Sequence, residues 1–277
     1  MKFNEICAEK ILSRTQISLA DYVINHYVGC QYSCLYCYAR YSKRNLKSKR
    51  DWGSFVDIKI NAPFLLEQEL EKVKPEKVLL GSITEVYQPV EKKYELTRKI
   101  LEILAEHKIK TVILTRSDLI LRDIDILKKL PKVSVFFTLS DKNEKISELF
   151  ENGSPSYKKR LSSIENLINE KINVWVHVGP IIPYFTDIDS IVSDILKFKV
   201  KKIEFENLNK NSAPVDKMIE LLSKLNPELG EKLKVLYSDF DAHNIYWRNE
   251  KLRMSELLEK INIKHHFSFL PLNDYFH

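Results

Sequence analysis

Short apolar runs rich in Val, Ile, Phe and Tyr alternate along this chain with longer amphipathic segments. Several of the runs are almost continuously apolar, which is typical of strands that are covered on both faces in a parallel sheet. These runs predict strands at residues 22–28, 77–82, 111–115, 133–139, 173–179, 201–207 and 234–239.

The segments between the runs repeat apolar residues at helical spacing. Residues 94–107 place Leu96, Ile100 and Leu104 on one face of a predicted helix. Another predicted helix spans residues 61–73, where Asn61 is a candidate N-cap residue. Further helices are predicted at residues 122–130, 156–170, 187–198 and 214–225.

Alternation of strands and helices predicts an α/β fold with a parallel sheet and right-handed crossovers, either barrel-like or doubly wound. Active sites of such folds lie at the carboxyl ends of the strands. This rule selects the segments that directly follow the predicted strands, which are residues 29–45, 82–93, 115–118, 138–142, 179–187 and 207–213.

The composition predicts a cytoplasmic protein without membrane contact. Its 277 residues are 44% hydrophobic and 30% charged, and no segment approaches the run of about 18–20 apolar residues that spans a membrane. The amino terminus lacks the apolar core of a signal peptide. The net charge of +6 permits contact with polyanions without requiring it.

Three of the four cysteines, Cys30, Cys34 and Cys37, lie within eight residues, directly after the first predicted strand. A disulfide framework is not expected in a reducing compartment, and the residues between the cysteines show no clean apolar face that would place them in a core. Such short spacings suit an iron–sulfur cluster. Three thiolates on a four-iron cube also leave one iron open for chemistry.

Two other interpretations of these cysteines remain open. Cys7 or His26 would supply the missing ligand of a four-ligand zinc site, in a zinc-stabilised nucleic-acid-binding module. Alternatively, the cluster would be present in a non-catalytic iron–sulfur electron-transfer protein.

The motif Cys30-x3-Cys34-x-Tyr36-Cys37 resembles the signature of the radical S-adenosylmethionine (SAM) superfamily. Later blocks, such as "TEVYQPVEKKYELTRKILEIL" and "HVGPIIP", are similar to the spore photoproduct lyase-like branch, and the resemblance runs from about residue 22 to residue 190. It implies a partial (β/α)6 TIM-like barrel at residues 22–240, with an N-terminal extension at residues 1–21. A C-terminal extension at residues 241–277 would pack on the barrel.

The resemblance also implies the chemistry. Cys30, Cys34 and Cys37 would ligate a [4Fe–4S] cluster, and the amino and carboxylate groups of SAM would chelate the fourth iron. A reductase or a flavodoxin- or ferredoxin-type protein would donate the electron that cleaves SAM to methionine and a 5′-deoxyadenosyl radical. The radical would abstract hydrogen from an unidentified substrate, for which nucleic acid is a candidate.

Further residues at strand ends are expected to hold SAM. Ser82, Thr84 and Glu85 offer acceptors for its ammonium group, although a solvated turn would have the same composition. Arg116 offers a guanidinium fork for its carboxylate. The other expected SAM-binding residues are Thr138 and Ser140 at the ribose, Ile181 or Ile182 at the adenine, and Tyr36 and Tyr38 beside the cluster or the adenine.

The sequence departs from true spore photoproduct lyases at one chemical position. The cysteine that returns hydrogen in those enzymes aligns at or beside Ser82, and no cysteine follows Cys37. Photoproduct repair is therefore not expected.

The basic run at residues 40–50 either follows a phosphate backbone or forms a solvated loop. His177 is expected in the core, and His265 and His266 on the surface.

Overall fold

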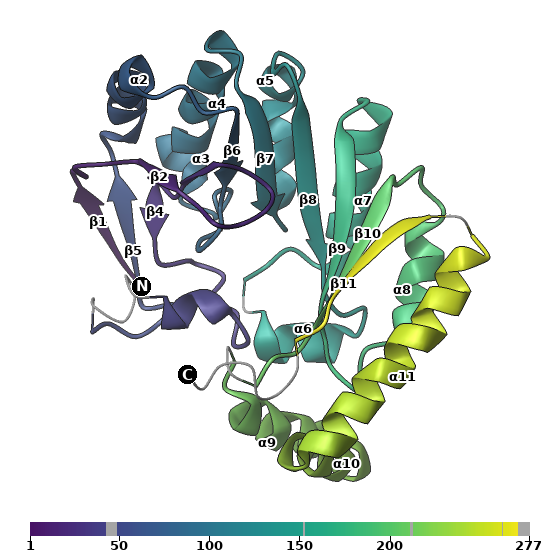
Figure 1. The fold of residues 1–277 in the computed structure, drawn as a ribbon. Coiled ribbons are helices and arrows are strands. Elements are labelled where there is room, and N and C mark those ends of the chain that lie inside the picture. The colour runs from purple at the N-terminus through teal and green to yellow at the C-terminus, as the bar shows by residue number, and fades with distance from the viewer. Residues whose placement is uncertain (43–48, 152, 211–212, 262, 271–277) are drawn as a thin grey trace. The chain divides into compact units, whose positions relative to one another are not determined.

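A computed structural model describes residues 1–42, 49–151, 153–210, 213–261 and 263–270 of the chain (Figure 1). The chain forms two compact units. The first comprises Met1–Ser33, Ala39–Phe137 and Gly153–Val174, and the second comprises Cys34–Tyr38, Thr138–Asn152 and Trp175–His277. Neighbouring cysteines of the motif therefore belong to different units, Cys30 to the first and Cys34 and Cys37 to the second.

The main sheet of the first unit is parallel except at one edge. Its strands follow the order β8-β7-β6-β3-β2, and only β2 is antiparallel to its neighbour. The strands are β2 (Leu12–Arg14), β3 (Tyr22–Ile24), β6 (Lys77–Leu80), β7 (Lys110–Thr115) and β8 (Val133–Leu139). The helices are α2 (Ala62–Lys72), α3 (Glu91–Tyr94), α4 (Leu96–Glu106), α5 (Ile124–Leu127) and α7 (Tyr157–Asn169).

A small three-stranded sheet in the first unit supports the start of the cysteine segment. It has the order β1-β5-β4, with β1 at Lys2–Ile6, β5 at Phe55–Lys59 and β4 at Tyr27–Val28. Tyr27, Val56, Ile58 and Leu96 form its buried core. The sequence pattern missed β1 and β5, because β1 is mostly exposed and Asp57 and Lys59 interrupt the apolar run of β5.

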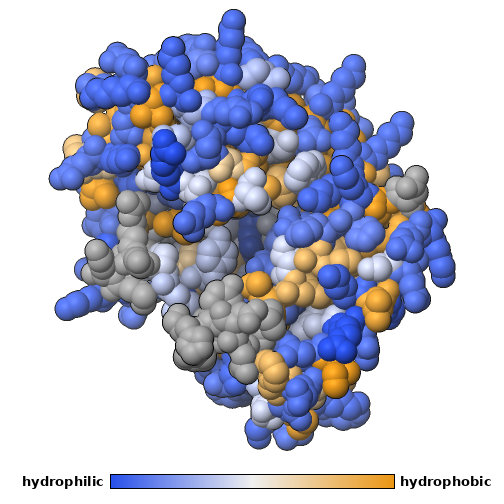
Figure 2. Space-filling view, viewed as in Figure 1, coloured by the Kyte–Doolittle hydropathy of each residue, from blue (hydrophilic) through white to orange (hydrophobic). Residues whose placement is uncertain are grey.

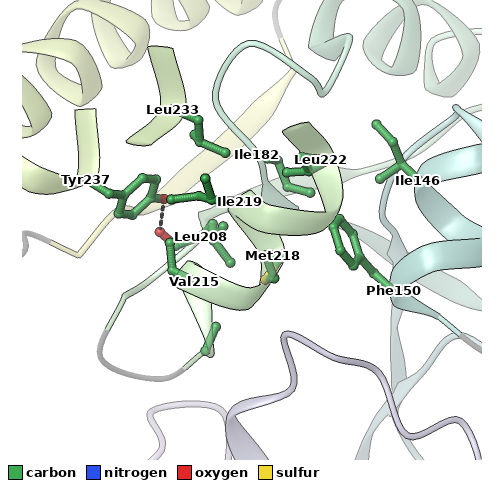
Figure 3. Close-up of a cluster of buried hydrophobic side chains, with 11 residues drawn as sticks. Ile146, Phe150, Ile182, Leu208, Val215, Met218, Ile219, Leu222, Leu233 and Tyr237 are labelled. Atoms are coloured by element: carbon green, nitrogen blue, oxygen red, sulfur yellow. Dashed lines mark hydrogen bonds between the residues drawn. The ribbon is translucent and has the colours of Figure 1, made fainter. Parts of the chain in front are cut away.

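The second unit contains the parallel strands β9 (Asn173–Ile181), β10 (Lys202–Asn207) and β11 (Lys264–Ser268), in that spatial order. Its helices are α6 (Glu144–Phe150), α8 (Ile188–Ile195), α9 (Val215–Leu225), α10 (Pro227–Ser238) and α11 (Phe240–Glu259). A cluster of buried apolar side chains from α6, α9 and α10 forms part of its core (Figure 3).

Most predicted elements are confirmed, and two predicted strands are corrected. Residues 22–28 form two strands, because the chain leaves β3 at Asn25 and pairs with β5 from Tyr27. Residues 234–239 belong mainly to helix α10, not to a strand. In α10 the apolar residues Leu233, Leu236 and Tyr237 are buried at helical spacing, and the side chain of Asn226 accepts a hydrogen bond from the N–H of Leu229.

Strands alternate with helices, and the sheets do not close into a barrel within the described residues. This agrees with the predicted α/β class. The expected division at residues 22 and 240 stays a prediction.

The face shown in Figure 2 is largely hydrophilic, with apolar side chains scattered across it. Among the described residues, every helix is too short or too polar to cross a bilayer.

Candidate functional site

The cysteine segment begins directly after strand β4, at a glycine that the packing requires. Gly29 has a φ of 83°, and a Cβ at this position would clash with the main-chain oxygen of Phe55 in β5. Only glycine adopts this conformation and allows so close an approach without strain. Cys30 follows and is 7% exposed. The chain thus leaves the small sheet at Gly29, and Cys30 is the first residue after this turn.

The loop after β6 holds the main chain on both sides of Cys30. Thr84 Oγ1 donates to the carbonyl of Gly29 at 2.7 Å, and Gln88 Oε1 accepts from the N–H of Gln31 at 2.9 Å. Gln88 Nε2 also donates to Thr84 Oγ1 at 3.3 Å, so the two contacts form one network. Gln88 is fully buried, where a polar group without a partner would be costly. We call Thr84 and Gln88 the Cys30 clamp.

Ser82 joins the same loop to the end of β3. Asn25 Nδ2 donates to Ser82 Oγ at 3.0 Å, and Asn25 Oδ1 accepts from the N–H of Ile83 at 3.2 Å. The buried Lys59 donates to the carbonyl of Asn25 at 2.5 Å. The bend between β3 and β4 is therefore fixed by polar contacts, not by apolar packing alone.

Glu85 links the loop after β6 to the end of β7. Its carboxylate accepts hydrogen bonds from Thr115 Oγ1 at 2.7 Å, from the N–H of Tyr87 at 2.9 Å and from the N–H of Arg116 at 3.0 Å. Burial raises the pKa of Glu85, although these hydrogen bonds and the charge of Arg116 oppose the rise. The structure thus brings together two residues that the sequence nominated from neighbouring strand ends.

Tyr32 ties the middle of the cysteine segment to the same strand end. Its hydroxyl donates to Ser117 Oγ at 3.0 Å, and the side chain is 4% exposed. Burial raises the pKa of Tyr32 above its usual range. Sequence reasoning did not select Gln31, Tyr32, Gln88 or Ser117. The sequence shows only that these residues are polar and lie in segments that follow strands. Most loops contain such residues, so this feature does not distinguish them.

Cys34 and Cys37 lie on a short segment of the second unit that is anchored on α6. The N–H of Leu35 donates to the carbonyl of Phe150 at 2.8 Å, and the hydroxyl of Tyr36 donates to the carboxylate of Glu151. Leu35 and Tyr36 also pack against the apolar cluster of Figure 3. Cys34 is buried and Cys37 is partly buried, and the N–H of Cys37 donates to the carbonyl of Cys34 at 3.1 Å.

The remaining residues nominated for SAM also belong to the second unit. Thr138 is the second-last residue of β8, and Ser140 directly follows the strand and is buried. Ile181 is 1% exposed, and its carbonyl accepts from the N–H of Leu208 at 3.0 Å. Tyr38 is 49% exposed, so it has accessible surface that a ligand would cover.

The histidines differ in their surroundings. His26 is fully buried and its Nε2 lies 2.9 Å from Thr97 Oγ1; burial and the charge of Lys59 lower its pKa to about 3. Cys7, the other candidate zinc ligand, is exposed. His177 was expected in the core, but its side chain is 21% exposed and pairs with Glu206 at 3.0 Å. His265 is partly exposed, and His266 is exposed as expected.

The basic run at residues 40–50 is described only in part. Lys43, Arg44 and Lys47 lie outside the described residues. Arg50 forms a two-pronged ion pair with Asp57, at 2.9 and 2.5 Å, and its guanidinium lies 3.5 Å from the ring centroid of Phe55. At least this basic side chain therefore stabilises β5 in the folded protein.

The sequence model of the radical SAM superfamily matches residues 24–195, which include all three cysteines of the motif. The chain belongs to the radical SAM superfamily. It is therefore a radical SAM enzyme, of a kind that uses SAM. An uncharacterized protein of Methanocaldococcus jannaschii is 36% identical over 205 residues, which is 74% of this chain and 77% of the relative. An uncharacterized protein of Mycobacterium tuberculosis is 26% identical over 85% of this chain and 73% of the relative.

Solved structures of other radical SAM proteins share the fold. Spore photoproduct lyase in complex with a dinucleoside spore photoproduct has a TM-score of 0.58 and 15% identity, over 81% of this chain and 66% of that one. SuiB of Streptococcus suis, bound to its precursor peptide SuiA, has a TM-score of 0.56 and 14% identity, over 89% of this chain and 48% of that one. This chain thus spans about half of SuiB and just under two thirds of the lyase. The likeness confirms the partial-barrel class.

Proposed function

We propose that Cys30, Cys34 and Cys37 hold a [4Fe–4S] cluster and that the chain cleaves SAM reductively to abstract hydrogen from a substrate. The observation that carries this proposal is the superfamily match across residues 24–195, which contains the three-cysteine motif. Three thiols at short spacing are the donors that such a cluster takes, and other residues hold the main chain on both sides of Cys30 and at Leu35. When bound, the cluster supplies the electron that splits SAM into methionine and a 5′-deoxyadenosyl radical.

The chain's own residues have separable roles in this proposal. The Cys30 clamp and the contact of Leu35 with Phe150 hold the main chain beside the thiols. Arg116 provides a cation for the SAM carboxylate. The accessible surface of Tyr38 and the hydroxyls of Thr138 and Ser140 would contact the nucleoside, with Ile181 and Tyr36 beside the adenine or the cluster.

Ser82, Thr84 and Glu85 have a second role that bears on their proposed contact with the SAM ammonium group. Each already binds a residue of the chain, namely Asn25, Gly29 and Arg116, respectively. Carboxylate and hydroxyl oxygens have more than one acceptor position, so each of them can take a further donor. We therefore propose that these side chains both shape the loop and face the ammonium group.

The reaction differs from photoproduct repair. The position that aligns with the hydrogen-donating cysteine of that branch falls at or beside Ser82, whose Oγ accepts a hydrogen bond from Asn25. A serine O–H bond is too strong to replace a thiol as a hydrogen-atom donor. We propose a different hydrogen-abstraction reaction, supplied with electrons by a reductase or a flavodoxin- or ferredoxin-type protein. A cytoplasmic location stays a prediction.

The test is SAM cleavage by protein that has been reconstituted with iron and sulfide without oxygen. With SAM and dithionite, the wild-type protein should form 5′-deoxyadenosine, and Cys34→Ala should lower the rate at least a hundredfold because the cluster loses a ligand. Cys7→Ala is the matched control, because Cys7 is exposed and lies outside the motif. It should retain wild-type activity.

Two results would contradict the proposal. One is SAM cleavage by Cys34→Ala at the wild-type rate. The other is a purified protein that holds zinc in place of iron and yields no 5′-deoxyadenosine after reconstitution. Iron, sulfide and product are each measured on the same sample, so a failed reconstitution is recognised by its iron content.

A further inference from the structure

The parallel sheet of the second unit has one covered face and one accessible polar face. Val176, Val178, Ile203 and Phe205 are buried on the covered face, where Phe205 stacks on Phe267 and Lys251 of α11 lies over the Phe267 ring. Helices α8 and α11 lie along this sheet in Figure 1. The alternating residues of β9 and β10 are partly exposed. Parallel sheets are usually covered on both faces, so an accessible face indicates a place for a ligand.

Two ionisable side chains on this face are paired near the carboxyl ends of their strands. His177 Nε2 of β9 lies 3.0 Å from Glu206 Oε2 of β10, and the Glu206 side chain is 36% exposed. The pair occupies the space above Gly179. A Cβ at Gly179 would lie 2.9 Å from both His177 Nε2 and Glu206 Cβ, so this glycine makes room for the pair.

A second acceptor lies beside the pair. Ser268 Oγ of β11 donates to Glu204 Oε1 at 2.8 Å, and Glu204 stands opposite His177 in the strand register. We call His177, Glu204, Glu206 and Ser268 the acceptor face. The cation of β10 on the same side, Lys202, lies toward the amino end, over the ring of Trp175 at 4.6 Å. The carboxylates thus lie near the carboxyl ends of the strands, where parallel sheets bind ligands.

The acceptor face lies on strands that also carry a residue assigned to SAM. Ile181, which we assign to the adenine, ends strand β9 four residues after His177. Its partner on β10 is Asn207, the residue that follows Glu206. A ligand on the acceptor face would therefore lie close to the strand end that carries Ile181.

We propose that the acceptor face binds the substrate through N–H donors of an amine or amide, as in a peptide, and that it disfavours a phosphodiester. This inference rests on the proposed function, since it assigns a substrate class to the same site. Carboxylate oxygens accept hydrogen bonds from N–H groups and attract cations. The same two carboxylates would repel a phosphate, and this repulsion is strong where water is partly excluded.

The first test identifies the donor of the abstracted hydrogen. Cells grown in D₂O supply two perdeuterated fractions, one of peptides from proteolysed protein and one of nuclease-digested nucleic acid. Each fraction is incubated with the reconstituted enzyme, SAM and dithionite. The mass of the 5′-deoxyadenosine that forms is then determined by mass spectrometry. The radical takes one deuterium from a substrate C–D bond, so the product becomes one mass unit heavier. We expect deuterium transfer from the peptide fraction.

Variants connect the transfer to the acceptor face. Glu206→Gln and His177→Gln should each lower the deuterated share of the product at least fivefold with the peptide fraction. Glu220→Gln is the control, because Glu220 is an exposed carboxylate that pairs with Lys217 and Lys224 on α9. It should leave the deuterated share unchanged. Circular dichroism melting checks that each variant folds.

The outcomes separate this inference from the proposed function. Deuterium from the nucleic-acid fraction alone, or unlabelled product with both fractions, would overturn the acceptor-face assignment while leaving SAM cleavage intact. No 5′-deoxyadenosine at all would overturn the proposed function on which it rests.

A second readout does not depend on turnover. Saturation-transfer NMR on the protein without cluster compares acetyl-lysine methylamide with thymidylyl-thymidine. We expect a signal from the amide probe that Glu206→Gln reduces at least threefold. A stronger signal from the dinucleotide, or no signal from the amide probe, would count against the inference.

Discussion

At the scale of single residues, buried polar side chains determine where the cysteine motif sits. Thr84 and Gln88 bind the peptide groups on either side of Cys30, and Glu85 binds the N–H of Arg116. The sequence nominated Thr84 and Glu85 as ligands of SAM. In the folded chain they also hold the loop, so a variant at either position would change both the loop and the proposed contact with SAM. Gln88 isolates the loop-holding role, because we assign it no contact with SAM.

We predict that Gln88→Leu lowers the free energy of unfolding by about 1–3 kcal/mol, because the N–H of Gln31 would lose its buried partner. Cluster content after reconstitution should fall as well, since the main chain beside Cys30 would be held less firmly. Urea denaturation and iron analysis measure the two effects. Gln68→Leu is the control, because Gln68 is exposed on α2 and its replacement should change stability by less than about 0.5 kcal/mol. Unchanged stability and iron content in Gln88→Leu would show that the clamp is unimportant.

At the scale of elements, helix α10 shows how a local apolar run can be misread. Residues 234–239 combine Val, Leu and Tyr, which predicts a strand. The segment is helical because it continues a helix that starts at Pro227, where a proline fits the first turn. Asn226 accepts a hydrogen bond from the N–H of Leu229 and so satisfies one of the unpaired donors of that turn.

Asn226→Ala should therefore destabilise the protein by about 1 kcal/mol through loss of this N-cap. Thermal melting followed by circular dichroism at 222 nm is the measurement. Lys234→Ala in the same helix serves as the comparison, because the Lys234 side chain is 68% exposed and its ion pair with Glu231 is long at 3.9 Å. Equal melting temperatures for the two variants would contradict the capping role.

At the scale of the whole molecule, stability in acid should depend on a buried histidine. His26 has a pKa of about 3 in the folded chain, against 6.5 for an unperturbed histidine. Between these values the unfolded chain binds a proton that the folded chain does not bind. The free energy of unfolding therefore falls as the pH falls from 6.5 toward 3, by up to about 1.4 kcal/mol per pH unit from this group.

His26→Gln should remove this part of the acid sensitivity while keeping a hydrogen-bonding side chain near Thr97. The measurement is urea denaturation of both proteins at pH 7, 6, 5 and 4. The difference in unfolding free energy, wild type minus variant, should decrease as the pH falls. A difference that stays constant over this interval would show that His26 titrates normally in the folded protein.

Much of the fold was predictable because it depends on local pattern. Near-continuous apolar runs identified β6 to β10, and helical spacing identified α2, α4, α7, α8 and α9. Strands β1, β2, β5 and β11 escaped prediction because charged or polar residues interrupt their apolar patterns. Their pairing partners, which lie far away in the sequence, decide their conformation.

The sequence by itself determined the family and the cysteine motif, because three thiols at short spacing are a local feature of the chain. Only the tertiary structure revealed the Cys30 clamp and the acceptor face. Gln88 and Gln31 are 57 residues apart in the chain, and His177 and Glu206 are 29 apart. No local pattern pairs such residues, because their contact is made only when neighbouring strand ends are brought together by the folding of the sheet.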